Sequence, residues 1–201
     1  MDLMKKLLLA SSNPGKLNEI HALLDDLGIA LVTPDDLMIS LEVEEDGATY
    51  AENASRKALA FARLSGLLTL ADDSGLEVDA LNGMPGLHSA RFSPLPRATD
   101  KDRRSYLLDK LKGYSQPWSA SFLCTIALAT PAGEVQFAEG VCQGEIIPTE
   151  RGQAGFGYDP IFLIPELGKT MAELTLEEKN RLSHRSRAVQ AMRPLLAAWL
   201  K

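Results

Sequence analysis

The sequence predicts an α/β protein built on a mixed β-sheet. The first observation is a buried strand over residues 6–11, followed at once by an amphipathic helix that begins at Pro14 and ends at Gly28. The second is a pair of long apolar runs, 119–130 and 135–147, that a short Pro-Ala-Gly-Glu turn joins into a hairpin. A hairpin pairs its strands antiparallel, so the sheet that also holds the N-terminal strand-turn-helix unit is expected to be mixed.

The composition is that of a single folded domain. The 201 residues are 45% hydrophobic and 24% charged, which provides enough apolar side chain to bury a core and too much for a disordered chain. No repeat, low-complexity stretch or linker interrupts residues 1–201. The net charge of −6 argues against a broad basic surface for a nucleic acid polymer, so an anionic ligand must be met by a local group of cations.

The elements before the hairpin follow from the same signals. Residues 29–33 form the next predicted strand, and Thr49 with Glu52 forms a capping box for a helix that ends at Gly66. A short strand over residues 67–71 comes next and leads into an Asp-rich sequence.

The rest of the chain combines a loop, a helix and a C-terminal helical region. The glycine- and proline-rich residues 82–96 have no periodicity and form a loop, and the charged helix 99–112 comes after it. After the hairpin, a strand is expected over residues 161–164 and helices from Met171 onward, with Pro194 kinking or restarting the last one.

The N-terminal region and the cysteines indicate a cytoplasmic protein with no membrane partner. The apolar run 7–10 is too short for a membrane span or the core of a signal peptide. Cys124 and Cys142 lie in strand-like runs without CxxC spacing, so we expect buried, reduced thiols, with a cross-strand disulfide as the alternative.

The junction of the first strand and the first helix is a candidate phosphate site. Small polar residues that lead into a helix N-terminus expose backbone N–H groups beside a hydroxyl, an amide and an ammonium. These residues are Ser11, Ser12, Asn13, Pro14, Gly15 and Lys16. The alternative is a plain capped helix start, with Asn13 as the cap and Lys16 in solvent.

Two adjacent carboxylates follow the strand 67–71. In an extended segment, neighbouring side chains point to opposite faces, so only one of Asp72 and Asp73 is expected to face a given ligand. A carboxylate there could bind a hard cation such as Mg²⁺, or accept a proton from water as a general base. The alternative is an Asp-rich turn in which both side chains bind local backbone groups.

An acidic segment and the helix after it could complete such a site. Glu44 and Glu45 offer a second carboxylate for the same metal, although acidic residues are also common in solvent before a helix start. Lys57 lies four residues after Asn53 and shares its helix face, so it is either a catalytic residue or an ordinary surface lysine.

Two sequences in the C-terminal third could contact a planar base. Phe156 is flanked by glycines that let a ligand approach closely, although a tight turn with core aromatics is an equal alternative. Ser183 can cap a new helix, which places His184 and Arg185 in its first turn. A cation in a first turn opposes the helix dipole, which indicates a partner for it. The alternative is that His184 is an ordinary surface histidine or a structural group with partners in the fold.

These sequences occur together in one order. They are Ser11-x-Asn13-x-x-Lys16, Glu52-Asn53-Ala54, Ala71-Asp-Asp-Ser-Gly75, Pro85-Gly86 with Ser89-Ala90-Arg91, Gly155-Phe-Gly-Tyr-Asp-Pro160, Lys179 and Ser183-His-Arg185. In this combination the chain resembles the inosine triphosphate pyrophosphatase family over nearly its whole length. The resemblance implies a long, twisted mixed sheet flanked by helices, with two lobes around a central active-site cleft, and one pyrophosphatase domain over residues 1–201.

The resemblance also implies an activity and the residues that perform it. Proteins of this family hydrolyse dITP, ITP and XTP to the monophosphate and pyrophosphate, use Mg²⁺ and usually form homodimers. By position, Asp73 is the general base and a metal ligand, Glu44 or Glu45 supplies the second metal ligand, and Lys57 belongs to the active-site helix. The triphosphate is held by Ser11, Ser12, Asn13, Pro14, Gly15 and Lys16, and Ser74 touches the substrate. The nucleoside and phosphates are surrounded by Phe156, Gly157, Tyr158, Asp159, Lys179, His184 and Arg185.

Base selection follows from hydrogen bonding. Hypoxanthine and xanthine carry a 6-keto acceptor where adenine carries an amino donor, so donors from Arg185, His184 or backbone N–H groups would be left unpaired by adenine. Guanine shares the 6-keto group, and the sequence does not indicate how it is rejected. The alternatives are a Maf-like pyrophosphatase for modified or pyrimidine nucleotides, and a protein that binds nucleotides without turnover.

Overall fold

The structure, a computed structural model, describes residues 5–199. Its strands are β1 (Lys6–Leu9), β2 (Ala30–Val32), β3 (Leu68–Val78), β4 (Pro85–Gly86), β5 (Trp118–Ala129), β6 (Val135–Ile146), β7 (Phe162–Ile164) and β8 (Lys169–Thr170). Its α-helices are α1 (Pro14–Leu24), α2 (Tyr50–Ser65), α3 (Asp100–Leu111), α4 (Leu176–Leu182) and α5 (His184–Trp199). Short 3-10 helices cover Asp25–Leu27, Asp35–Leu37, Asp79–Leu81, Ser89–Arg91, Asp159–Ile161, Pro165–Leu167 and Met171–Glu173.

The strands of the described residues form one eight-stranded sheet. Its order is β2-β1-β3-β5-β6-β7-β8, with β4 paired to β3 outside this path. β1 runs parallel to both β2 and β3, whereas the pairs β3-β4, β6-β7 and β7-β8 are antiparallel. The predicted α/β fold with a mixed sheet and flanking helices is therefore confirmed.

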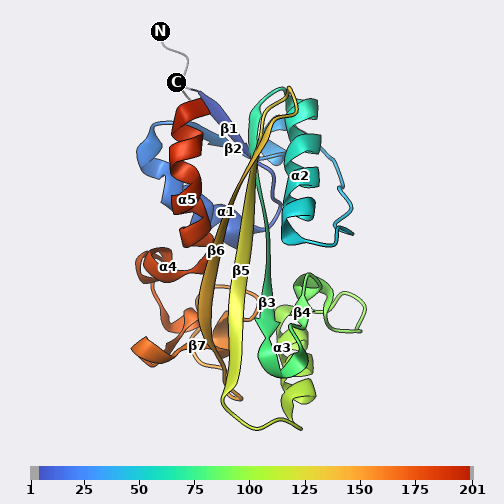
Figure 1. Cartoon of the computed structure of the whole chain (residues 1–201), viewed down its shortest axis with the longest axis vertical. Coiled ribbons are helices and arrows are strands. Elements are labelled where there is room, and N and C mark those ends of the chain that lie inside the picture. Colours follow the sequence, from blue (N-terminus) through green and yellow to red (C-terminus); the bar gives the residue numbers. More distant parts are fainter. Residues whose placement is uncertain (1–4, 200–201) are drawn as a thin grey trace. The chain divides into compact units, whose positions relative to one another are not determined.

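The chain divides into two compact units, of which the first holds residues 5–73, 124–140 and 185–199. In this unit α1 and α5 cover one face of the sheet and α2 covers the other (Figure 1). β1 shows the alternation that this requires, because Leu7 and Leu9 pack with α1 and α5 whereas Leu8 packs with α2. β1, which lies between β2 and β3, is thus buried on both faces.

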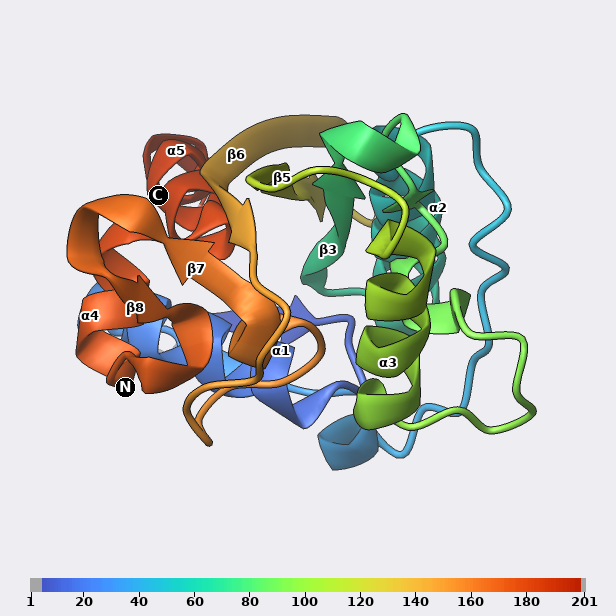
Figure 2. The same ribbon diagram turned by 90° about the horizontal axis from the view of Figure 1, so that it is seen from below.

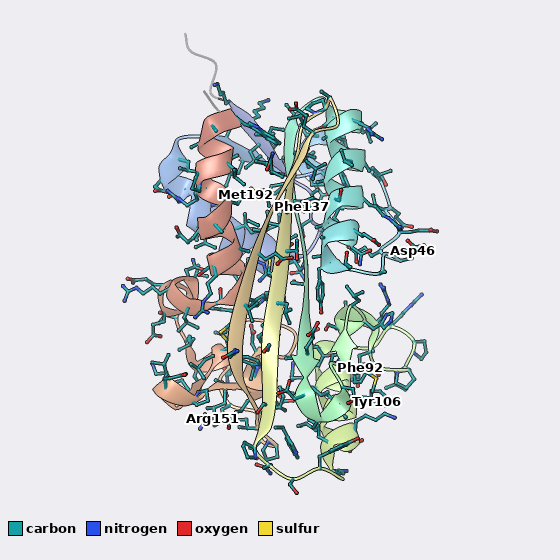
Figure 3. All side chains as sticks on the ribbon, viewed as in Figure 1. Asp46, Phe92, Tyr106, Phe137, Arg151 and Met192 are labelled. Carbon is teal, nitrogen blue, oxygen red and sulfur yellow. The ribbon has the colours of Figure 1, made fainter. Side chains whose placement is uncertain are left out.

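The second unit holds residues 74–123 and 141–184. Apolar side chains from α3 and from the strands β5, β6 and β7 form its core. Figure 2 shows this unit from below, with α3 on the right and β7, β8 and α4 on the left. The loop after β4 is attached to α3 by a ring contact of Phe92 with Tyr106, whose centroids lie 5.2 Å apart at 65° (Figure 3). The expectation of an active-site cleft between two lobes stays a prediction.

The structure corrects two predictions of local structure. β3 continues through residues 72–75 to Val78, so the two aspartates lie inside a strand and not at its end or in a turn. Both side chains form hydrogen bonds with residues far away in the sequence, and the free energy of these contacts outweighs the low strand preference of Asp, Ser and Gly. α5 runs through Pro194, so the expected restart is wrong, because Met192 and Leu196 on either side are buried in the same core. The expected kink at Pro194 stays a prediction.

Two further expectations concern the whole chain. Cys124 and Cys142 are both buried and form no disulfide in the described part of the chain, as the sequence predicts. None of the helices within residues 5–199 is long and apolar enough to cross a membrane.

Candidate active site

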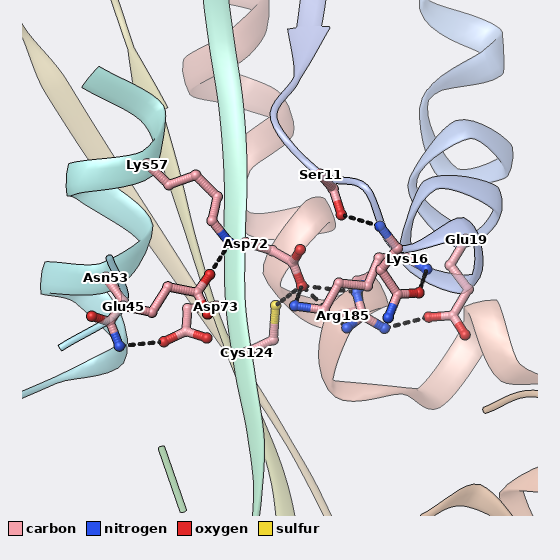
Figure 4. A network of polar contacts seen from close by, with 11 residues as sticks. Ser11, Lys16, Glu19, Glu45, Asn53, Lys57, Asp72, Asp73, Cys124 and Arg185 are labelled. Carbon is pink, nitrogen blue, oxygen red and sulfur yellow. Dashed lines mark hydrogen bonds and ion pairs between the residues drawn. The ribbon is translucent and has the colours of Figure 1, made fainter. Parts of the chain in front are cut away.

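The Asp72 face of β3 carries a buried network of charges. The Asp72 carboxylate accepts hydrogen bonds from Nε and Nη2 of Arg185, both at 3.1 Å, and lies 3.2 Å from the ammonium of Lys16 (Figure 4). A second carboxylate, that of Glu19, accepts a hydrogen bond from Nη1 of Arg185 at 2.5 Å. The Arg185 side chain is only 1% exposed, so these contacts hold α1, β3 and α5 together inside the first unit.

The charges in this network compensate one another. Burial alone would raise the pKa of Asp72, but the Lys16 and Arg185 cations outweigh burial and hold that pKa well below its usual range. Burial opposes the charged form of Arg185, yet Asp72 and Glu19 raise its pKa above the ordinary value. The Sγ atom of Cys124 lies 3.9 Å from Asp72, and burial raises the pKa of this thiol to about 12. Cys124 is therefore an uncharged thiol at neutral pH.

The opposite face of β3 presents Asp73 to α2. Asn53 Nδ2 donates a hydrogen bond to Asp73 Oδ2 at 2.9 Å, and Asp73 is only 8% exposed (Figure 4). Burial raises the pKa of Asp73 and the charge of Glu45 adds to this, whereas the Asn53 hydrogen bond and the Lys16 and Lys57 cations offset only part of it. Asp73 is therefore a stronger proton acceptor than an ordinary aspartate.

α2 attaches the acidic segment to the Asp73 face. Asn53 Oδ1 accepts the N–H of Gly47 at 2.8 Å, and Lys57, one turn further along, forms an ion pair with Glu45. A side chain at Gly47 would come within 2.7 Å of Asn53 Oδ1, so the close approach requires glycine there. Glu45 is half-buried and lies beside Asp73, whereas Glu44 is exposed (Figure 4). The shared helix face predicted from the spacing of Asn53 and Lys57 is confirmed.

The N-terminus of α2 differs slightly from the predicted capping box. Thr49 Oγ1 accepts the N–H of Glu52 at 3.1 Å, as expected for the cap. The Glu52 carboxylate, however, accepts the N–H of Ala48 at 2.8 Å, one residue before the cap. Gly66 ends the helix in the left-handed conformation at φ 69°, as predicted.

The strand-to-helix junction has the geometry of a capped helix start. Asn13 Oδ1 accepts the N–H of Lys16 at 3.1 Å, Pro14 occupies the first helical position, and Ser11 Oγ accepts the N–H of Asn13 at 3.2 Å. The Lys16 side chain is 16% exposed and paired with Asp72, so the expectation of a solvated lysine in the alternative is wrong. Phosphate binding by this junction stays a prediction.

A cavity of about 560 Å³ opens beside this junction in the first unit. Ser11, Ser12, Glu44, Glu45 and Lys57 line it, which brings together residues that the sequence assigns to phosphate, metal and catalysis. The sequence did not predict its apolar lining, which consists of Pro34, Ile39, Leu41, Val43 and Phe61 together with Ala10. In the part of the chain that the structure describes, no three His, Cys, Asp or Glu side chains gather as a ready-made metal site.

In the second unit, Asp159 organises the loop that carries Phe156. Its buried carboxylate accepts the backbone N–H of Phe156 at 2.9 Å and pairs with the ammonium of Lys179 at 2.6 Å. The same ammonium lies 5.1 Å from the centroid of the Phe156 ring. Gly155 is required here, because a Cβ on it would lie 2.0 Å from Asp159 Oδ2.

Three other predicted substrate residues are buried against protein partners. The Tyr158 hydroxyl donates to the carbonyl of Ser89 at 2.9 Å, and burial raises the pKa of that hydroxyl. His184 starts α5, as predicted, and its ring stacks on Phe122 with 4.8 Å between centroids. Arg185 follows His184, and its guanidinium donates hydrogen bonds to Asp72 and Glu19 in the first unit. Contacts of Tyr158, His184 and Arg185 with a substrate stay predictions.

Comparison with known proteins places this arrangement in a family, because a model of the Ham1 family matches residues 7–195. The chain belongs to the Ham1 family. It is 47% identical over 192 residues to a dITP/XTP pyrophosphatase of Desulforamulus reducens, which covers 95% of each chain. It is 48% identical to a dITP/XTP pyrophosphatase of Geobacter sulfurreducens, over 94% of this chain and 96% of that one. The structure of a HAM1 protein from Coxiella burnetii superposes with a TM-score of 0.87 and 41% identity, over 97% of this chain and all of that one.

In this member of the Ham1 family, the predicted site residues fall into two sets. The first unit holds Ser11, Ser12, Asn13, Pro14, Gly15, Lys16, Glu44, Glu45, Lys57, Asp73 and Arg185. The second holds the half-buried Ser74, with Phe156, Gly157, Tyr158, Asp159, Lys179 and His184. Sequence reasoning missed Glu19, although a glutamate directly before Ile20, on the buried side of an amphipathic helix, is a signal that could have identified it.

Proposed function

We propose that this chain is a nucleoside triphosphate pyrophosphatase that hydrolyses dITP, ITP and XTP to the monophosphate and pyrophosphate. The observation that supports it is the pairing, in one unit, of a carboxyl with a raised pKa and a cavity lined by hydroxyl, ammonium and carboxylate groups. The dITP/XTP pyrophosphatases of Desulforamulus reducens and Geobacter sulfurreducens, which match almost end to end, supply the substrate class.

Asp73 acts as the general base in this proposal. A water oxygen forms a bond to the α-phosphorus, its proton passes to Asp73, and the bond from the α-phosphorus to the bridging oxygen breaks as pyrophosphate leaves. The Asn53 amide donates to Asp73 Oδ2 and thereby orients the carboxylate that accepts the proton. The raised pKa favours this transfer, because a carboxylate of ordinary pKa is a weak base at neutral pH.

Lysines of the first unit neutralise the triphosphate. The Lys16 ammonium is paired with Asp72 and the Lys57 ammonium with Glu45, so each cation is already held by a carboxylate before substrate binds. Pairing fixes the position of a long, flexible side chain, and a phosphate can then share the ammonium without ordering it anew.

The donor set of the Asp73 face fits Mg²⁺. Asp73 and Glu45 offer carboxylate oxygens only, the ligands that Mg²⁺ prefers, and this ion keeps several waters, so one or two protein carboxylates are enough. We assign the second carboxylate to Glu45 and not to Glu44, because Glu45 lies beside Asp73 whereas Glu44 is exposed. When bound, the ion would neutralise phosphate charge and make a nearby water more acidic.

Base recognition is assigned to the second unit. Phe156 offers a ring for stacking, and donors from His184 or backbone N–H groups would bind the 6-keto oxygen that adenine lacks. Arg185 lies in the first unit, where its guanidinium donates to Asp72 and Glu19, and its contact with the base stays a prediction. A homodimer and a cytoplasmic location belong to the same proposal and are supported by the family resemblance. Light scattering on the purified chain measures the dimer directly.

A substrate panel tests the function. Pyrophosphate release is measured with dITP, ITP, XTP, ATP, GTP and a modified pyrimidine triphosphate, with and without Mg²⁺, on the wild type and on Asp73→Asn as the matched inactive control. We expect Mg²⁺-dependent release from dITP, ITP and XTP above that from ATP and GTP. Preference for the pyrimidine nucleotide would favour the Maf-like alternative, and binding without release would favour a non-catalytic nucleotide-binding protein.

A further inference from the structure

The N-terminal half of α3 contacts both backbone groups of Gly157. The Asp100 carboxylate accepts the N–H of Gly157 at 2.7 Å, and Nη1 of Arg104 donates to the Gly157 carbonyl at 2.8 Å. Asp100 and Arg104 are four residues apart on one helix, so they present both groups from the same helix face. All of these residues belong to the second unit.

Arg104 uses all three nitrogens of its guanidinium in this arrangement. While Nη1 binds Gly157, Nε and Nη2 donate to the two carboxylate oxygens of Glu150 at 2.9 and 3.0 Å. This bidentate ion pair fixes the plane of the guanidinium as well as its position. The Arg104 side chain is 11% exposed and that of Glu150 is 39% exposed, so the guanidinium is mostly buried and its carboxylate partner lies at the surface.

The same loop is fixed on its other side by Asp159. Its carboxylate accepts the N–H of Phe156 at 2.9 Å, and its backbone N–H donates to the Phe156 carbonyl at 3.1 Å. Each backbone N–H and C=O of Phe156 and Gly157 therefore has a partner, two from Asp159 and two from α3. Gly157 adopts φ 58°, a left-handed conformation that glycine reaches without steric cost.

We propose that Arg104, held by Glu150, is a positioning residue that sets where the Phe156 ring stands and thereby determines the affinity for the purine base. The proposal rests on the proposed function, in which Phe156 stacks on the base. Arg104 acts through the Gly157 carbonyl and touches no substrate. Its removal takes away the donor to the Gly157 carbonyl, so the Gly157–Tyr158 peptide shifts and the neighbouring Phe156 ring shifts with it.

The test compares Arg104→Lys and Arg104→Leu with a matched control. Lysine keeps the charge but cannot bind Glu150 and Gly157 together, and leucine removes both contacts. We expect the KM for XTP to rise by roughly threefold for lysine and roughly tenfold for leucine, with kcat within about twofold of the wild type. The control is Arg181→Lys on α4, which alters an exposed arginine paired with Glu177 in the same unit and is expected to leave both constants unchanged.

Two further measurements separate positioning from simple destabilisation. The dissociation constant of the monophosphate XMP, measured by calorimetry, is expected to rise by the same factor as KM, because it reports base and ribose contacts without turnover. In a Phe156→Leu background, Arg104→Lys is expected to have no further effect on either constant, since the ring through which it acts is gone.

Specific results would overturn the proposal. An unchanged KM and XMP affinity, a fall in kcat alone, or an effect of equal size in the Phe156→Leu background would each show that Arg104 serves only the fold. A wild type that binds XMP but releases no pyrophosphate would instead reject the proposed function, and the calorimetric comparison would still decide the role of Arg104.

Discussion

Asp72 and Asp73 are neighbours in the sequence and both are buried, but the two faces of β3 shift their pKa values in opposite directions. Asp72 faces two cations, Lys16 and Arg185, which hold its pKa below the usual range. Asp73 faces an amide and a half-buried glutamate, so burial dominates and its pKa is raised. Burial alone raises the pKa of any carboxyl, and the partners on each face therefore decide the outcome.

This difference indicates a division of labour across one strand. A carboxylate with a depressed pKa stays charged and can hold Lys16 in place, but it is a poor proton acceptor. A carboxyl with a raised pKa is a better acceptor, and its charged form costs stability at neutral pH. We expect substitution of Asp72 to change stability and substitution of Asp73 to change catalysis.

The largest expected effect is that of Asp73→Asn on turnover. Asparagine keeps the shape and cannot accept the proton, so we expect kcat to fall by roughly 10²- to 10⁴-fold, the usual contribution of a general base. Pyrophosphate release under saturating substrate measures it. Turnover near that of the wild type would remove Asp73 from the mechanism.

The same variant has a stability outcome with a defined sign. Because the pKa of Asp73 is raised in the folded state, the wild type loses stability as pH rises from the ordinary value of 3.8 through the raised one. The Asp73→Asn variant has no ionisable group at this position, so it does not lose this stability as pH rises. Its melting temperature at pH 7 is expected to equal or exceed that of the wild type, and a clear decrease would contradict the assignment.

Asp72→Asn is expected to show the reverse pattern. It leaves the buried guanidinium of Arg185 with Glu19 as its remaining carboxylate, and breaking such a pair costs about 3–5 kcal/mol of unfolding free energy. The stability from a depressed pKa is complete above the ordinary value of 3.8 and is lost as pH falls toward the folded value. Urea unfolding should therefore show a constant gap between wild type and variant above about pH 5 and a shrinking gap below pH 4. A gap that does not change with pH would contradict this reasoning.

Asn53→Ala tests whether the Asn53 hydrogen bond influences the pKa of Asp73. The amide hydrogen bond favours the charged form of Asp73, so its loss is expected to raise the pKa further and move the acid limb of kcat/KM to higher pH by about one unit. Asn18→Ala, at an exposed position of α1, is the control. A pH profile that matches the wild type would show that Asn53 does not tune the base.

Thr49→Ala has the smallest expected effect. It removes the side chain that caps α2, which should cost about 1 kcal/mol of unfolding free energy and leave kcat unchanged, because Asn53 and Lys57 lie beyond the first turn. Thermal unfolding and a rate measurement check both parts. A large loss of activity would indicate that the start of α2 contacts the site.

Much of the local structure can be predicted from the sequence, because it depends on residues that are near one another in the chain. Asn13 and Pro14 begin α1, Thr49 caps α2 and Gly66 ends it, all through contacts within a few residues. The apolar runs on either side of a Pro-Ala-Gly-Glu turn predict β5 and β6 for the same reason. The order of the site sequences was also sufficient to indicate the family.

The sequence alone determined that Asp72 and Asp73 point to opposite faces, because side chains alternate in any extended segment. Only the tertiary structure decided that β3 continues through both residues, and which side chains contact each of them. Arg185 reaches Asp72 from 113 residues away, and Asn53 reaches Asp73 from 20. Local preference favours a turn at these residues, and the free energy of distant ion pairs and hydrogen bonds overrides it.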